Sequence, residues 1–153
     1  MPTIEELIKT KPIKDYYNRA AINIMYTGNW MQNMMNQTLK PHDLTEQQYN
    51  VLRILRGQKG ATMNLYEIQD RMIQRMSNVS RLIDKLLDKG FVDRKECKEN
   101  RRRVDIYITT KGLQILEDVE PAVRDVFKFI NSNITKDEAK QLAELLDKIR
   151  GDQ

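Results

Sequence analysis

Apolar side chains recur at helical spacing along most of the chain, which predicts a mainly α-helical fold. The first such segment runs from about Ile13 to Leu39 and is interrupted in composition only by Gly28. A second helix is predicted to begin after Thr45, because Thr45 and Gln48 form a capping-box signature, and to end near Gly57. A long helix and a medium one therefore come first.

Two short helices are predicted next, with few residues between them. Asn64 and Glu67 mark the start of the first, and Ser77 is the expected N-cap of the second. Gly90 is expected to end the second helix in the left-handed conformation. The apolar face of this helix is defined by five side chains: Val79, Leu82, Ile83, Leu86 and Leu87.

A β-hairpin is predicted after these helices. Residues 91–96 form its first strand, 97–100 the turn and 103–109 the second strand. In the second strand Val104, Ile106 and Ile108 alternate with polar or half-polar side chains, which is typical of a strand buried on one face. The tip of the hairpin is basic, with Lys98, Arg101, Arg102 and Arg103.

Two further helices complete the chain. Thr109 and Thr110 can cap a long helix in which Pro121 predicts a kink, and Thr135 with Glu138 forms another capping box. The predicted fold is mainly α with a small β-hairpin wing: a winged helix-turn-helix with N- and C-terminal helices.

Composition narrows the possible functions. The chain has 153 residues and a net charge of +4. Residues 71–103 hold 11 Lys or Arg against 5 Asp or Glu, whereas residues 112–153 hold 6 against 9. One cysteine, Cys97, and one histidine, His42, cannot build a disulfide or a Cys/His metal cluster, so no metal, cofactor or enzymatic site is expected. No signal peptide or membrane-spanning run is visible, which makes a cytoplasmic location the expectation.

The exposed face of the second short helix suits contact with double-stranded DNA. In a winged helix-turn-helix this helix enters the major groove with its N-terminal end toward the bases. Arg can pair with guanine, Asn with adenine and Ser with either base. An ordinary solvated helix face is the alternative. The candidate DNA-contacting residues here are Ser77, Asn78, Ser80, Arg81 and Lys85, with Asp84 on the same face.

The basic hairpin tip adds a second candidate contact. Its cations can follow phosphates or insert into a narrow minor groove, and such contacts position a protein more than they specify sequence. The alternative is a charged turn that keeps an edge strand from aggregating. The candidate residues of the tip are Lys98, Asn100, Arg101, Arg102 and Arg103.

Three stretches together resemble the multiple-antibiotic-resistance-regulator (MarR) family of bacterial transcription factors. They are "LTEQQYNVLRIL" at 44–55, "SNVSRLIDKLLDKGFVDR" at 77–94 and "NRRRVDIYITTKG" at 100–112. The resemblance implies a homodimer, with 1–43 as an N-terminal dimerisation arm, 44–111 as the DNA-binding domain and 112–153 as C-terminal dimerisation helices. The family wing usually carries Asp-x-Arg, and here Asn100 stands in place of the acid while Arg102 is kept. A neutral amide holds a neighbouring arginine less strongly than a carboxylate does.

The resemblance also implies regulation, because many members of the family bind small aromatic or phenolic compounds or sense oxidants. Aromatic and methionine side chains at helical spacing more often belong to a core or a dimer interface than to a ligand pocket. Cys97 lies among cations that can lower the pKa of a thiol, but an incidental exposed thiol is the simpler interpretation. His42 is expected in the loop before the second helix, where a capping or solvated side chain is the simplest role. The candidate pocket residues are Tyr26, Trp30, Met31, Met34 and Met35.

A sequence-specific, signal-responsive DNA-binding repressor is therefore the predicted function. The alternatives are a winged-helix module for protein interaction and a nonspecific DNA-binding protein.

Overall fold

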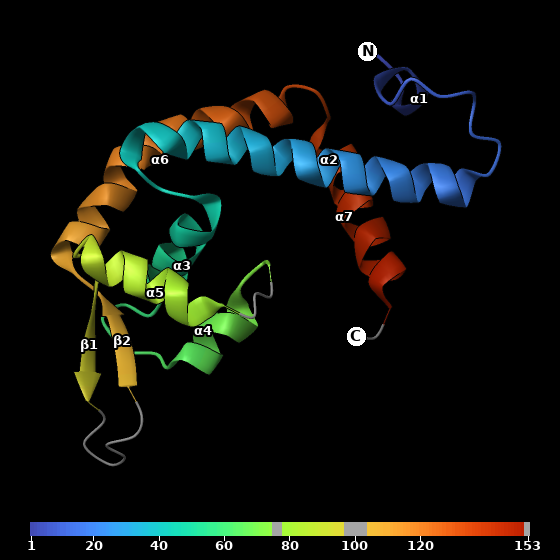
Figure 1. Ribbon diagram of the computed structural model, residues 1–153. Helices are drawn as coiled ribbons and strands as arrows, with labels where there is room; N and C mark the ends of the chain where they lie inside the picture. The colour runs from blue at the N-terminus through green and yellow to red at the C-terminus, as the bar shows by residue number, and fades with distance from the viewer. Residues whose placement is uncertain (75–77, 97–103, 152–153) are drawn as a thin grey trace.

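The chain folds into an arm and a lobe (Figure 1). A computed structural model describes residues 1–74, 78–96 and 104–151. The arm consists of α1 (Ile4–Leu7), α2 (Tyr16–Leu39), the second half of α6 (Thr110–Asn131) and α7 (Lys136–Arg150). The lobe consists of α3 (Glu46–Gly57), α4 (Leu65–Arg71), α5 (Val79–Asp88), β1 (Val92–Glu96) and β2 (Val104–Ile108). A short 3₁₀ turn, η1 (Lys40–His42), joins α2 to the lobe. The predicted fold, mainly α with a β-hairpin wing and with N- and C-terminal helices, is confirmed.

Capping boxes start the helices where the sequence predicts them. Thr45 and Gln48 cap α3 reciprocally, and Asn64 and Glu67 do the same for α4. The box at the start of α7 is also present. Each box satisfies amide groups that the first turn of a helix leaves without partners.

Helix α1 was missing from the sequence prediction. Thr3 and Glu6 form its capping box, and Ile4 is buried. Glu5 accepts a hydrogen bond of 2.7 Å from Arg19 Nε on α2. This contact with the Arg19 guanidinium lowers the pKa of Glu5 to about 2. The N-terminal segment is therefore held against α2 by a charged contact as well as by an apolar one.

The hydrophobic core lies in the lobe and continues into α2 and α6. It gathers side chains from α3, α4, α5, both strands and the first half of α6. Burying such side chains is the main source of favourable free energy in folding. The side chains that are almost fully inaccessible are Leu39, Val51, Leu52, Leu55, Ile68, Ile83, Leu86, Val92, Ile106, Leu116 and Val119.

The hairpin is a two-stranded antiparallel sheet whose base is built into the lobe. Its register pairs Val92 with Ile108 and Arg94 with Ile106. Met63, in the loop before α4, adds a bridge by exchanging backbone hydrogen bonds of 2.9 and 2.8 Å with Ile106. The side chain of Ile106 is buried, so the alternation predicted for β2 is confirmed there. These contacts fix the base from which the hairpin projects.

Helix α6 links the two parts of the molecule. Figure 1 shows that it leaves the hairpin, bends and then follows α2. Pro121 lies inside this helix and has no N–H to donate to the preceding turn, which favours bending. Within the described ranges, no helix combines the length and the apolar character that crossing a membrane requires.

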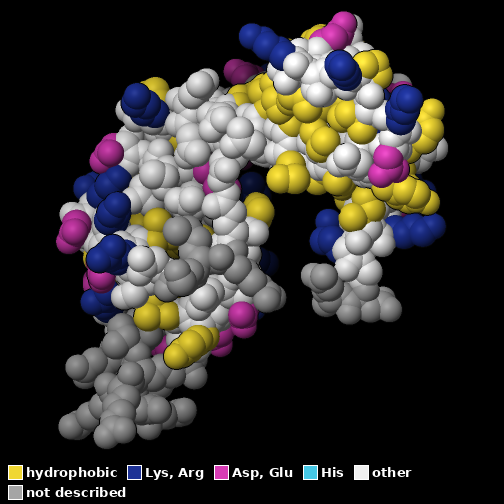
Figure 2. Space-filling model, turned by 45° about the vertical axis from the view of Figure 1, so that its right-hand side comes forward, with side chains coloured by type: hydrophobic (Ala, Val, Ile, Leu, Met, Phe, Trp, Pro, Cys, Tyr) yellow, Lys and Arg dark blue, Asp and Glu magenta, His cyan; other side chains and the backbone are white. Residues whose placement is uncertain are grey.

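The arm exposes many apolar side chains. Every residue of α7 is described and none is buried, although Leu142, Leu145 and Ile149 lie in it. Figure 2 shows apolar side chains gathered over the N- and C-terminal helices, and a deep hollow between the lobe and α7. The exposed apolar residues of the arm include Leu7, Ile8, Tyr17, Ile24, Met25, Phe129, Leu142, Leu145 and Ile149. A patch of this kind marks an interaction surface.

Candidate nucleic-acid interface

Helix α5 divides its side chains into a buried face and an exposed face. Val79, Leu82, Ile83 and Leu86 are buried against the lobe. The opposite face is polar and open to solvent, as the helical period predicts. Its exposed residues are Asn78, Ser80, Arg81, Asp84 and Lys85. This face of the helix is accessible to a ligand as large as a DNA duplex.

The N-cap of α5 differs by one residue from the prediction. Asn78 occupies the N-cap position, not Ser77, and its side chain makes no capping hydrogen bond. Ser77 lies outside the described residues. Serine and asparagine are equally good caps, so the sequence could not decide between two neighbours. The apolar period, which starts at Val79, was the more reliable guide to where the helix begins.

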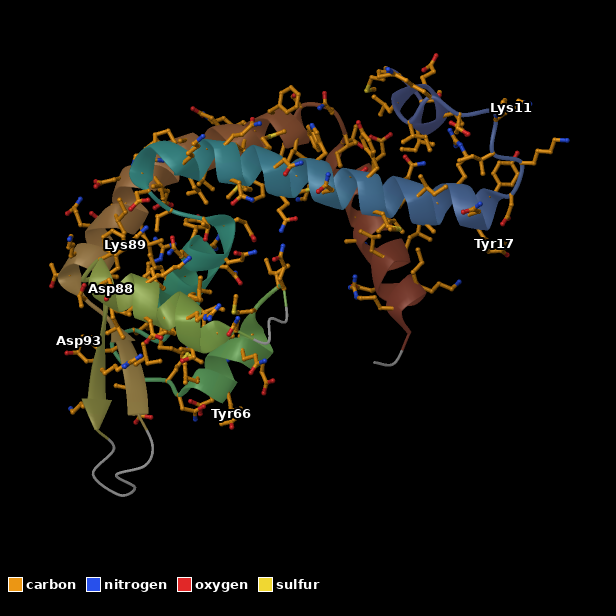
Figure 3. The ribbon with its side chains drawn as sticks, in the orientation of Figure 1. Lys11, Tyr17, Tyr66, Asp88, Lys89 and Asp93 are labelled. Atoms are coloured by element: carbon orange, nitrogen blue, oxygen red, sulfur yellow. The ribbon has the colours of Figure 1, made fainter. Side chains whose placement is uncertain are left out.

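The C-terminal end of α5 connects directly to the hairpin. Gly90 has a φ of 70°, and its N–H donates to the carbonyl of Leu87 at 2.8 Å. The N–H of Phe91 donates to the carbonyl of Leu86 at 2.9 Å, which completes a Schellman motif. Lys89 Nζ lies 2.9 Å from Asp43 Oδ2, just before α3. The end of α5 is thus fixed to both the hairpin and the start of α3. Asp88, Lys89 and Asp93 lie along this connection (Figure 3).

Polar side chains of α3 hold the turn between α4 and α5. Asn50 Oδ1 accepts a hydrogen bond of 3.3 Å from the backbone N–H of Ile73. Gln47 Nε2 donates to Gln74 Oε1 at 2.9 Å. The bond from Asn50 satisfies a backbone N–H just after α4, and the bond from Gln47 holds the side chain of Gln74. Neither contact could be predicted from the sequence, because the partners are 23 and 27 residues apart.

A groove runs between the start of α3 and the exposed face of α5. It encloses about 530 Å³ and contains Arg81 and Lys85 together with Asp84 and Asp88. Thr45, Gln47 and Gln48 form its other wall. Both charge signs are therefore present on the face that α5 exposes.

The hairpin is connected to α5 and braced between its own strands. Arg94 Nη2 on β1 donates to Asp84 Oδ1 on α5. Across the strands, the hydroxyl of Tyr107 donates to Asp93 Oδ2 at 3.0 Å, and this hydrogen bond raises the pKa of Tyr107. The predicted basic tip, with Lys98, Asn100, Arg101, Arg102 and Arg103, lies outside the described residues, as does Cys97.

A second cavity, also of about 530 Å³, lies between α2 and the lobe. Of the five predicted pocket residues, Met31 and Met35 are among its lining. Tyr26, Trp30 and Met34 are not among the residues that line it. Trp30 instead packs near Phe129 of α6, with ring centroids 6.4 Å apart. The remaining lining comes from Gly28, Gln32, Glu46, Tyr49, Asn50, Arg53, Ile73, Gln74 and Phe127.

Glu46 gives this cavity a polar wall. Its Oε2 atom is buried and has no hydrogen-bond partner among the described residues. Burial raises the pKa of this carboxyl. On the same wall the guanidinium of Arg53 lies 5.8 Å from the centre of the Tyr49 ring, within the range of a cation–π contact.

His42 lies in the turn η1, with its side chain half-buried, which agrees with the loop position expected for it. Within the described ranges, no three His, Cys, Asp or Glu side chains are grouped so that they could hold a metal ion.

Known proteins resemble this chain in sequence and in structure. A model of the MarR family matches residues 44–104. The multiple antibiotic resistance protein MarR of Escherichia coli is 30% identical over 117 residues, which cover 76% of this chain and 80% of that protein. The match includes the lobe and extends well beyond it.

Two solved structures resemble the whole architecture. A mutant MarR of E. coli, crystallised in complex with operator DNA, has a TM-score of 0.76 and 27% identity, covering 89% of this chain and 99% of that one. A MarR-like transcription regulator from Bacillus cereus has a TM-score of 0.77 at 23% identity, covering 89% and 97% of the two chains, and supports the fold alone.

Proposed function

Because the chain belongs to the MarR family of winged helix-turn-helix transcriptional regulators, we propose that it is a signal-responsive repressor. In this proposal it binds a palindromic operator in the cytoplasm as a homodimer. The family assignment makes the chain a DNA-binding regulator and not an enzyme. The operator, the dimer and the signal are the parts that we infer.

The observation that carries the proposal is the exposed polar face of α5. Its buried face anchors the helix in the lobe, so the opposite face projects as a rigid unit. Asn78, Ser80 and Arg81 lie at its N-terminal end, and all three are exposed. We assign base contacts to these residues and to Ser77, and a contact with the DNA backbone to Lys85.

The hairpin tip supplies the second contact in this proposal. The hairpin is fixed to the lobe through Met63 and Ile106, which lies in the middle of β2. Lys98, Asn100 and the arginines 101–103 lie between β1 and β2 in the sequence. We assign them to the phosphate backbone beside the groove that α5 occupies, where their charge adds affinity more than specificity.

The exposed apolar surface of the arm supports the homodimer. Leu145 and Ile149 of α7 are 58% and 64% exposed in the single chain. Their burial against a second copy would remove apolar surface from water, as would that of Tyr17 and Met25 on α2. In this arrangement residues 1–43 and 112–153 form the dimerisation part, and 44–111 form one DNA-binding lobe per protomer. Two lobes in a two-fold dimer match a palindromic site.

The cavity between α2 and the lobe supports a response to a small molecule. Its walls come from the arm through Met31 and Met35, and from the lobe through Glu46 and Tyr49. An aromatic or phenolic compound held there would favour one position of the lobe relative to the arm. Such a compound changes DNA binding only when it binds one lobe spacing more tightly than the other.

Selection from a randomised pool of duplex DNA tests the proposal. We expect the purified protein to enrich a two-fold symmetric sequence with half-sites about one helical turn apart. Binding to the enriched sequence should weaken steeply with added salt, because phosphate contacts release counterions. Enrichment of no sequence would contradict the proposal. It would leave nonspecific DNA binding if salt-sensitive binding persists, or a protein-interaction role if it does not.

A further inference from the structure

Asp84 is an acidic residue on a surface that is proposed to approach DNA phosphates. It lies between Arg81 and Lys85 on the exposed face of α5. An unpaired carboxylate in this position would repel the phosphate backbone. Asp84 is paired, however, because its Oδ1 accepts a hydrogen bond from Arg94 Nη2 on β1.

This contact continues across the hairpin. Arg94 follows Asp93, and the carboxylate of Asp93 accepts hydrogen bonds from the Arg94 backbone N–H at 2.7 Å and from the Tyr107 hydroxyl at 3.0 Å. Tyr107 is the partner of Asp93 in the strand register. Polar contacts therefore run from α5 through β1 to β2.

The contact lies level with the point where the second strand is held to the lobe. Ile106, in the middle of β2, pairs in register with Arg94 and exchanges backbone hydrogen bonds with Met63. Each strand of the hairpin therefore has its own contact at this level, β1 with Asp84 of α5 and β2 with Met63. Without the contact at Asp84, the hairpin would be held at this level through β2 alone and could pivot relative to α5.

We propose that Asp84 is a positioning residue for DNA binding, which holds Arg94 and, through it, the hairpin at a fixed angle to α5. The inference rests on the proposed function, since it concerns how the helix and the hairpin engage one duplex together. Its consequence is opposite to that of simple electrostatics. Removing this negative charge weakens DNA binding, because the hairpin must then be ordered at the moment of binding.

Asp88 provides a matched control. It lies on the same helix one turn further on, is exposed and lines the same groove. It takes part in no hydrogen bond or ion pair among the described residues, whereas Asp84 is bonded to Arg94. Asp84→Asn and Asp88→Asn remove the same charge from the same helix, and only the first removes an ion pair with the hairpin.

The test measures dissociation constants of wild type, Asp84→Asn, Asp84→Glu and Asp88→Asn by fluorescence anisotropy on the selected duplex. We expect Asp84→Asn to weaken binding by about two- to five-fold, the range of an exposed ion pair. Asp84→Glu, which keeps the acid, should recover most of this loss. Asp88→Asn should bind as tightly as wild type or more tightly. Tighter binding by Asp84→Asn would overturn the proposal and mark Asp84 as a competitor of phosphate for Arg94.

Amide hydrogen exchange of the free protein separates this inference from the proposed function. In Asp84→Asn the amides of β1 and β2 should exchange several-fold faster than in wild type, and in Asp88→Asn they should not. Unchanged exchange in Asp84→Asn would overturn the positioning role even if the protein bound no DNA. Absence of DNA binding by wild type, with faster exchange in Asp84→Asn, would overturn the proposed function and the role in DNA binding together, leaving only a structural contact.

Discussion

Replacement of Gly112 by alanine tests how the hairpin base packs against α6. Gly112 is buried in the first turn of α6. A Cβ atom at this position would lie 2.1 Å from the backbone oxygen of Phe91 and 2.8 Å from Ile108 Cγ1. The Phe91 oxygen also accepts a hydrogen bond of 3.1 Å from the Thr109 N–H. The backbone of Phe91 therefore cannot move away without loss of that bond.

The magnitude follows from these contacts. Inserting a methylene into a packed core costs about 1–3 kcal/mol, and a contact with backbone belongs at the upper end of that range. The greater helix propensity of alanine offsets at most about 1 kcal/mol. We expect a net loss of roughly 2 kcal/mol in the free energy of unfolding, which lowers Tm by about 4–8 °C in a domain of this size.

Thermal unfolding followed by circular dichroism, at one fixed protein concentration, measures this loss. Gly57→Ala is the control, because Gly57 ends α3 and its added Cβ would meet no atom within 4 Å. This variant should unfold at the wild-type Tm or slightly above it. A Gly112→Ala variant with a Tm equal to or above wild type would refute the packing described for the hairpin base.

Three other changes test separate parts of the molecule. Arg102→Ala should weaken DNA binding and reduce the slope of log K against log salt by about 1, since one phosphate contact is lost; an unchanged slope would remove Arg102 from the interface. Glu46→Gln should raise the free energy of unfolding at pH 7 by about 1 kcal/mol, because a buried carboxylate oxygen without a partner is costly. The pKa of Glu46 is higher in the folded than in the unfolded state, so the cost of its buried charge is present at high pH and disappears as pH falls through the folded-state pKa toward the ordinary value. The stability advantage of Gln should therefore shrink between pH 7 and pH 4 in thermal melts. An advantage that is constant with pH would contradict the assignment. Leu145→Asp should convert the proposed dimer to monomers in sedimentation velocity, since Leu145 is 58% exposed in the single chain; an unchanged sedimentation coefficient would exclude α7 from the proposed interface.

The helices of the lobe could be predicted because local chemistry determines their ends. The boxes at Thr45 and Asn64, and the glycine after α5, each satisfy backbone groups within a few residues in sequence. Helix α1, which was not predicted, has the same kind of signature in Thr3 and Glu6. It is too short to show an apolar period, so its box was the one available signal.

The exposed face of α5 could also be predicted, whereas the contacts that position it could not. The helical period alone separates Arg81 and Asp84 from the buried residues. The bond between Asp84 and Arg94 depends on how closely the hairpin approaches α5. That approach is set by packing at Ile106 and Gly112, which no local pattern reveals.

The pocket residues illustrate the same limit. Met31 and Met35 are one turn apart on α2, and so are Trp30 and Met34. The second pair is offset from the first by one residue, which is about 100° around the helix. Only the position of the lobe decides which pair lines the cavity. The structure places Met31 and Met35 there, together with Glu46, which helical spacing on α2 could not include.

The central claim is that the exposed face of α5 reads a DNA sequence. The most direct measurement is the ratio of dissociation constants for the selected duplex and a scrambled duplex of equal length, for wild type and Arg81→Ala at one salt concentration. We predict that wild type prefers the selected duplex by at least about 10³-fold. Arg81→Ala should lose about 1–3 kcal/mol on the selected duplex and little on the scrambled one. Equal affinity of wild type for both duplexes would contradict the claim.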